Sequence, residues 1–166
     1  MRILKLGLIS FLMFFLLITV ISLFIPSNVR ISKAINVASS NDSIWQQITD
    51  FNNWEKWNPF VSDTSIKTKT ISSDNNEMQI DGTTVRWRER KENIAIADMT
   101  TQGHRAIESV WNTINYSSSD SITIQWYLNF KLRWYPWEKF SSLMLEKSYG
   151  PALEKGLTNL KRELEN

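Results

Sequence analysis

Apolar and polar positions change their spacing several times along the 166-residue chain, and each change marks an expected element. Residues 6–25 form the first pattern, twenty positions without a charge, interrupted only by Ser10, Thr19 and Ser22 as polar side chains. At about 1.5 Å per residue this run measures roughly 30 Å as a helix, which is the thickness of the hydrocarbon core of a bilayer. The pattern therefore predicts a membrane-spanning helix.

Two interpretations of this apolar run compete, an uncleaved anchor and a signal peptide that is removed. A signal peptide usually has an apolar region of only about 7–15 residues, followed by small residues at the cleavage site. Here the run is longer, and its best pair of small residues, Val20 and Ser22, makes a poor cleavage site. The pattern favours an anchor and short linker over residues 1–27. Either interpretation carries the remaining residues, 28–166, across the membrane as one domain.

Charges beside the apolar run bear on the orientation of the anchor. Arg2 and Lys5 precede it and favour a cytoplasmic N-terminus, while Arg30 and Lys33 on the far side reduce the bias. We expect a single-pass protein with its N-terminus in the cytoplasm and its domain, residues 28–166, on the outer face.

Beyond the linker, alternating apolar and polar residues predict antiparallel strands, with one short helical region near the start. Residues 29–37 alternate with period two, and residues 44–48 carry apolar side chains at helical spacing after several N-cap candidates. Asp81-Gly82 is a strong hairpin signal. The further strands expected from the pattern are residues 65–71, 77–80, 84–90, 93–101, 105–115 and 122–132.

The C-terminal third places its apolar residues on single faces. Even-numbered positions of residues 122–132 are apolar or aromatic, which predicts a strand with one buried face. Four leucines between residues 153 and 164 are spaced 4, 3 and 4 apart, which predicts an amphipathic helix lying on a sheet. Gly150-Pro151 predicts a kink or a joint between two shorter helices. The order of elements predicts an α+β fold, a curved antiparallel sheet of six or seven strands wrapped around a long C-terminal helix.

Aromatic residues are the unusual feature of the composition, with eight Trp and eight Phe. Three of these rings lie within residues 51–57, and they have three interpretations: a core plug, a lid over a ligand, or a stacking platform for nucleic acid. A nucleic-acid platform needs a cationic groove. Asp50 and Glu55 adjoin the rings, and the net charge of the chain is only +2. The sequence therefore predicts no nucleic-acid partner.

Four segments together resemble the membrane-anchored members of the SRPBCC superfamily, the helix-grip proteins that include START lipid-transfer domains and polyketide cyclase/dehydrase proteins. These segments are Ile25-Pro26-Ser27, VRISKAINVASSNDSIWQQITDFNNWEKWNPF at residues 29–60, Val85-Arg86-Trp87, and YGPALEKGLTNLKRELEN at residues 149–166. The resemblance implies a hydrophobic pocket, without a shared catalytic residue or cofactor. It implies that the partner is a lipid-like, hydrophobic or amphipathic small molecule.

The resemblance also indicates which residues line such a pocket between the sheet and the C-terminal helix. They are Trp54, Trp57, Trp87, Trp111, Trp126, Phe130 and Met144. Two alternatives stay open. One is an enzyme of the cyclase or dehydrase kind that uses a carboxylate in the pocket, and the other is a structural module whose large side chains fill the cavity.

Candidates for chemistry are few, because the chain has no Cys and a single His, His104, in an expected turn. This composition excludes thiol nucleophiles and thiolate metal sites and makes a zinc site improbable, so no metal is predicted. Glu89 shares strand parity with Val85 and Trp87, and would be a buried acid or base if those residues face inward. Asp98 is a second such candidate, sharing parity with the isoleucines of its strand. The alternative for both carboxylates is an ion pair with an arginine on a neighbouring strand.

Three arginines at alternate positions, Arg86, Arg88 and Arg90, share one face of a predicted strand. They have two interpretations, a site for an anionic headgroup or the solvated face of the sheet.

Overall fold

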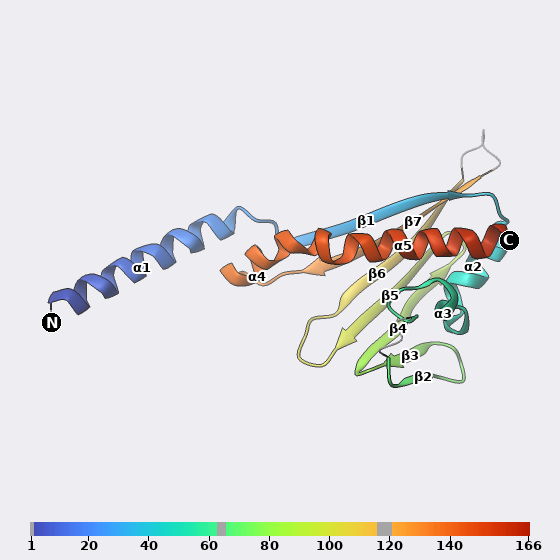
Figure 1. Cartoon of the computed structure of the whole chain (residues 1–166), viewed down its shortest axis with the longest axis horizontal. Coiled ribbons are helices and arrows are strands. Elements are labelled where there is room, and N and C mark those ends of the chain that lie inside the picture. The colour runs from blue at the N-terminus through green and yellow to red at the C-terminus, as the bar shows by residue number, and fades with distance from the viewer. Residues whose placement is uncertain (1, 63–65, 116–120) are drawn as a thin grey trace.

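The computed structural model describes residues 2–62, 66–115 and 121–166 (Figure 1). Residues 116–120, between the predicted strands 105–115 and 122–132, and the first residue of the predicted strand 65–71 lie outside this range. The helices are α1 (Arg2–Leu23), α2 (Asn41–Thr49), α3 (Trp54–Trp57), α4 (Pro136–Ser141) and α5 (Leu145–Glu165), with short 3-10 turns η1 (Phe51–Asn53) and η2 (Ser142–Met144). The strands are β1 (Asn28–Val37), β2 (Lys69–Ile71), β3 (Glu77–Ile80), β4 (Thr83–Lys91), β5 (Ile94–Thr101), β6 (Ile107–Asn115) and β7 (Ile122–Lys131).

All seven strands form one antiparallel sheet in the order β1-β7-β6-β5-β4-β3-β2. Helix α5 lies across the sheet and contacts β1, β7 and α3, while α1 extends away from the domain (Figure 1). Helices α2 and α3 cover the end of the sheet farthest from α1, and α4 lies at the near end (Figure 1). The predicted helix-grip α+β fold is confirmed.

The period-two pattern of β7 is confirmed by its burial. Ile124, Trp126, Leu128 and Phe130 are buried on the face that meets α5. On β5 the buried positions are the small ones, Ala95 and Ala97, while Ile94 and Ile96 are only half-buried. This arrangement reflects the neighbouring strands: Ala95 pairs with Trp111 and Ala97 with Trp87, so each methyl group leaves room for an indole.

Between the sheet and α5, the aromatic residues pack against one another. Trp54 lies centrally, with its ring centroid 4.9 Å from Phe51, 5.2 Å from Trp111 and 5.7 Å from Trp57. Trp111 in turn stacks on Trp126 at 5.5 Å. The indole N–H groups of Trp54 and Trp57 donate to the carbonyls of α2, at Ile48 and Gln47. The aromatic cluster within residues 51–57 is therefore part of the core.

Helix α5 is continuous from Leu145 to Glu165, with Pro151 in its second turn. The expected division at Gly150-Pro151 is therefore wrong: the joint between helices lies earlier, at η2. Pro151 lies beyond the first turn, so it cannot donate to the Lys147 carbonyl, yet the helix continues through it. Gly156 lets the helix approach the sheet, since an added Cβ would lie 2.6 Å from Cζ3 of Trp126.

Two local predictions, a hairpin turn and a helix N-cap, are also confirmed. Asp81 and Gly82 both have positive φ, 43° and 82°, in the turn between β3 and β4. The side chain of Ser40 caps α2 by accepting from the backbone N–H of Ser43.

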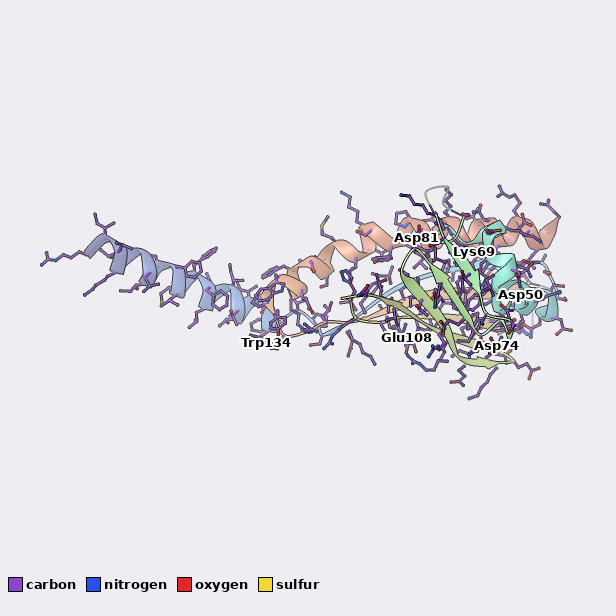
Figure 2. All side chains as sticks on the ribbon, turned by 90° about the horizontal axis from the view of Figure 1, so that it is seen from below. Asp50, Lys69, Asp74, Asp81, Glu108 and Trp134 are labelled. Carbon is purple, nitrogen blue, oxygen red and sulfur yellow. The ribbon has the colours of Figure 1, made fainter. Side chains whose placement is uncertain are left out.

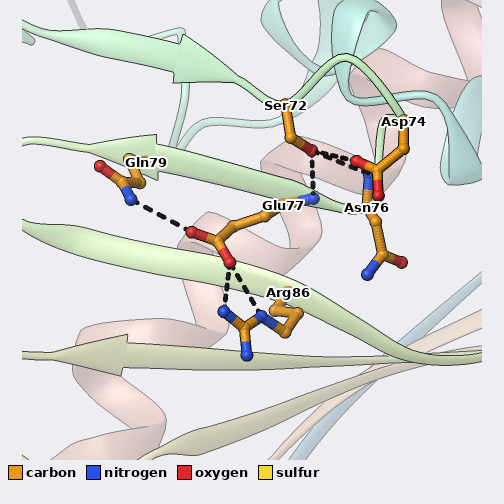
Figure 3. Close-up of polar contacts among 6 residues, drawn as sticks. All are labelled: Ser72, Asp74, Asn76, Glu77, Gln79 and Arg86. Carbon is orange, nitrogen blue, oxygen red and sulfur yellow. Dashed lines mark hydrogen bonds and ion pairs between the residues drawn. The ribbon is translucent and has the colours of Figure 1, made fainter.

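Side-chain bonds stabilise the turn between β2 and β3 and the pairing of β3 with β4 (Figure 3). Ser72 accepts from the backbone N–H groups of Asn76 and Glu77 and donates to Asp74, while the Glu77 carboxylate accepts from Gln79 and Arg86.

Candidate ligand site

An open pocket of about 470 Å³ lies at the end of the domain nearest to α1. We call it the end pocket. It is bounded by the turn between β5 and β6, the last residues of β7, α4 and the first turns of α5. Its lining residues are Thr101, Gly103, His104, Arg105, Ala106, Ile107, Phe130, Lys131, Leu132, Arg133, Glu138, Leu145 and Tyr149.

Apolar side chains from three elements form one part of the end pocket. Phe130 comes from the buried face of β7, Ile107 from the start of β6, and Leu145 and Tyr149 from successive turns of α5. The Phe130 and Tyr149 rings are in contact, with centroids 5.0 Å apart. This part of the pocket continues the hydrophobic core to the surface.

Cations border the other part. Arg105, Lys131 and Arg133 make no ion pair with any residue in the described ranges. Arg105 donates weakly to the Lys131 carbonyl at 3.4 Å, and the Arg133 guanidinium lies over the Tyr135 ring. Glu138 is the one acid among the lining residues, and its carboxylate accepts from the backbone N–H of Arg133 at 2.6 Å. The border is therefore net positive and has unused hydrogen-bond donors.

Of the seven predicted pocket residues, Phe130 borders the end pocket. Trp54, Trp57, Trp87, Trp111 and Trp126 are buried in the aromatic core instead. Met144 is exposed on η2. The five tryptophans therefore pack against one another in the core. The end pocket lies beside them, under the N-terminal end of α5.

Glu89 does not point into the core as its parity suggested. A register irregularity between Trp87 and Glu89 interrupts the pairing of β4 with β5. After it, Arg90 pairs with the buried Ala95, and Glu89 forms an ion pair with Lys91 on the outer face. The inward parity of Glu89 is therefore wrong, because a β-bulge inserts an extra residue and reverses which positions face inward.

Asp98 also faces outward, on the side of β5 opposite to Ala97. The Arg88 guanidinium binds the Asp98 carboxylate. It also binds the Glu108 carboxylate on the next strand, at 2.5 Å. The alternative of an ion pair with an arginine is the arrangement observed. Neither Glu89 nor Asp98 meets the condition for a catalytic carboxylate, since both have cationic partners and neither borders the end pocket.

The three arginines of β4 do not act as one cationic face. Arg86 pairs with Glu77, Arg88 with Asp98 and Glu108, and Arg90 lies near the Trp87 ring. Glu108 is held ionised by its neighbours: a hydrogen bond from Asn129 at 2.6 Å, and then the Arg88 guanidinium, lower the pKa of its carboxyl. The contacts of Arg86, Arg88 and Glu108 form the charged outer face of the sheet.

None of the titratable groups at the end pocket was predicted as a site residue. His104 is exposed, as expected for a turn, but it borders the pocket together with Glu138. Periodicity gives no signal for such positions, because they come from a turn and from the start of a short helix. No group of three His, Asp or Glu side chains in the described ranges could hold a metal ion.

Helix α1 carries its apolar side chains on the outside, as the sticks in Figure 2 show. Within the described residues it is the one helix with the length and composition to cross a bilayer. It meets the domain at α4, where the Lys139 ammonium donates to the Ile25 carbonyl and the Ser27 hydroxyl.

The fold and the end pocket define a class of protein, a helix-grip domain that offers a pocket beside its long C-terminal helix. Residues 28–165 match the family described as polyketide cyclase / dehydrase and lipid transport. The chain belongs to this family. No curated protein matches the chain.

Solved structures show the same fold at low sequence identity. A START superfamily protein from Mycobacterium smegmatis is 20% identical with a TM-score of 0.61, over 82% of this chain and 97% of that one. A truncated norcoclaurine synthase from Thalictrum flavum is 17% identical with a TM-score of 0.58, over 84% and 95% of the two chains. The di-domain ARO/CYC protein StfQ of the steffimycin biosynthetic pathway is 9% identical with a TM-score of 0.59, over 83% of this chain and 51% of that one.

Proposed function

We propose that the protein is a membrane-attached binding domain whose ligand is an amphipathic, anionic, lipid-like molecule held in the end pocket. One observation carries this proposal: an apolar surface and a border of unpaired cations meet in a single pocket at the end of the domain from which α1 extends. The family description, which includes lipid transport, supports the same class of ligand.

The size and lining of the end pocket suit an acyl chain or a comparable apolar group. A volume of about 470 Å³ lies in the range of about 300–1,000 Å³ that is typical of small-molecule sites. Burial of each CH₂ group against Phe130, Leu145 and Tyr149 would contribute about 0.8 kcal/mol to binding.

The cations suit a carboxylate or phosphate at the other end of the ligand. Arg105 and Arg133 retain guanidinium N–H groups that no carboxylate in the described ranges occupies. Guanidinium groups bind such anions through two parallel hydrogen bonds. An anionic amphiphile therefore satisfies both parts of the pocket at once.

Membrane attachment through α1 is the second part of the proposal. The exposed apolar surface of α1 favours an environment of lipid, and its contacts with α4 support a helix that is retained. We keep the expected topology, with the N-terminus in the cytoplasm and the domain on the outer face. The intact mass of protein from the membrane fraction checks this: the mass of the full chain is expected, and a mass that lacks residues 1–25 would identify a cleaved signal peptide.

Ligand binding is tested on residues 25–166, which keep both acceptors of Lys139. Calorimetric titration with dodecanoate and with dodecanol, below their aggregation limits, separates the two parts of the pocket. We expect both to bind, and dodecanoate to bind more tightly.

A matched pair of variants locates the site. Ala106→Trp fills the end pocket, whereas Gln102→Trp places the same side chain in the same exposed turn outside its lining. We expect A106W to abolish binding and Q102W to retain it. Equal binding by the two variants would show that the ligand binds elsewhere, and no binding by the unaltered domain would overturn the proposed ligand class.

A further inference from the structure

The segment that joins the end pocket to α1 has its polarity reversed relative to a helix of a water-soluble domain. Along α4 and η2 the buried positions are Pro136, Lys139 and Ser142. Apart from Ser141, the exposed positions are apolar: Trp137, Phe140, Leu143 and Met144, with Trp134 just before them. Trp137 and Leu143 are 62% and 68% exposed. We call these five exposed residues the apolar patch.

The contacts of Lys139 explain why polar side chains are buried on this segment. Its side chain is only 4% exposed, and its ammonium donates to the Ile25 carbonyl at 2.7 Å and the Ser27 hydroxyl at 2.8 Å. Ser142 donates to the Lys139 carbonyl at 2.6 Å. The polar face of α4 thus binds the chain directly after α1, so the opposite, apolar face is turned away from the domain.

We propose that the apolar patch lies in the headgroup region of the bilayer that α1 enters, and that it holds the end pocket open toward the membrane surface. This inference rests on the proposed attachment through α1. Three observations on the described residues favour lipid as the partner of the apolar patch: its continuity with α1, its composition and its charges.

Continuity places the patch at the membrane. α1 ends at Leu23, only five residues before β1 begins, and α1 contacts α4 directly. Figure 2 shows Trp134 close to the end of α1. A bilayer around α1 therefore reaches the patch without any movement of the domain.

Composition and charge suit the interface between lipid and water. Three rings form a stack centred on Tyr135, which lies parallel to Trp137 with centroids 4.8 Å apart and is tilted to Trp134 with centroids 4.9 Å apart. Tryptophan and tyrosine are enriched at the level of the lipid headgroups, where an apolar ring and a polar edge are both satisfied. Arg133 adjoins the stack and is free to bind lipid phosphate.

The consequence for the pocket follows from shared residues. Arg133 and Glu138, which border the end pocket, flank the stack in sequence, and Leu145 directly follows the patch. With the patch in the headgroups, the pocket opens toward lipid, so a ligand can pass between membrane and pocket over a short path.

The test uses the full chain in nanodiscs that contain phosphatidylcholine with phosphatidylglycerol, one chain per disc. Because the chain has no cysteine, single substitutions give uniquely placed nitroxide labels. Leu143→Cys reports on the patch, Lys155→Cys on the exposed side of α5, and Leu12→Cys on the middle of α1. The measurement is the collision rate of each label with oxygen, which concentrates in lipid, relative to a water-soluble nickel chelate.

We expect the labels at positions 12 and 143 to favour oxygen and the label at position 155 to favour the chelate, with severalfold differences in the ratio. A label at position 143 that behaves like position 155, while position 12 favours oxygen, would overturn the patch but leave membrane attachment intact. A label at position 12 that favours the chelate would overturn attachment and the inference with it. In a second preparation with two chains per disc, dipolar broadening at position 143 would show a second copy on the patch, which also overturns the inference.

Discussion

The ammonium of Lys139 donates a hydrogen bond of 2.7 Å to the carbonyl of Ile25, more than a hundred positions earlier in the chain. This carbonyl belongs to the turn that ends α1, where Ile25 itself donates to the Ser22 carbonyl. The positive charge of Lys139 is also attracted to the negative, C-terminal end of the α1 helix dipole. The contact joins α4 to the end of α1, and we expect it to fix the angle at which α1 leaves the domain.

Replacing Lys139 with methionine tests this role. Met keeps the length of the side chain but removes the donor, so the Ile25 carbonyl loses its partner and the junction becomes mobile. With nitroxides at L12C and K155C, we expect a broader distribution of label-to-label distances in the variant. Lys147→Met, an exposed lysine of α5, is the matched control and should leave the distribution unchanged. Equally narrow distributions in both variants would show that Lys139 does not fix the junction.

Neutralising the border of the end pocket should separate charge recognition from apolar binding. Arg105→Gln and Arg133→Gln each remove one exposed cation, for which a loss of about 1 kcal/mol, or roughly fivefold in dodecanoate affinity, is expected. Dodecanol has no charge, so its affinity should not change. Arg86→Gln, on the outer face and paired with Glu77 (Figure 3), is the control. A similar loss with R86Q would indicate a general effect of net charge.

Gly156→Ala should destabilise the domain although alanine is the better helix former. The substitution gains about 1 kcal/mol in helix propensity. However, its Cβ would lie 2.6 Å from Trp126 and 3.0 Å from Pro59, and neither ring can move without disturbing the core. We expect a net loss of about 1–3 kcal/mol in the free energy of unfolding, measured by urea denaturation. Lys155→Ala, on the exposed side of the same helix, is the control and should have no comparable effect. Unchanged stability of G156A would show that Trp126 and Pro59 move aside at little cost.

The lowered pKa of Glu108 predicts that part of the folding stability is lost in acid. Asn129 and Arg88 lower the pKa of its carboxyl in the folded state below the ordinary value of 4.5. The resulting stabilisation is present above pH 4.5 and is lost as the pH falls through the depressed folded pKa. Glu108→Gln should therefore be less stable than the unaltered protein at pH 7, by on the order of 0.5 kcal/mol for a partly solvated group. The difference should shrink as the pH falls from 4.5 through the folded pKa, in thermal unfolding followed by tryptophan fluorescence. A constant difference across this range would contradict the assignment.

The sequence predicted the elements well but the inward face of two strands poorly. Alternation identified the buried face of β7 correctly, because that strand is regular and its partners oppose it in register. On β4 the bulge before Glu89 reversed the parity, and nothing in TTVRWRERK marks where an extra residue is inserted. On β5 the larger isoleucines suggested the wrong inward face, because two alanines are what the neighbouring indoles allow.

The amino-acid sequence by itself determined the apolar segment of α1, the order of strands and helices, the Asp81-Gly82 turn and the leucine face of α5, because each depends on local spacing and backbone preference. Tertiary structure alone decided where space remains. Five tryptophans that could have lined a cavity pack together instead, because their rings reach one another across the sheet, and the end pocket lies beyond these rings. Volume left between packed elements depends on how their side chains meet in three dimensions, and spacing along the chain does not encode it.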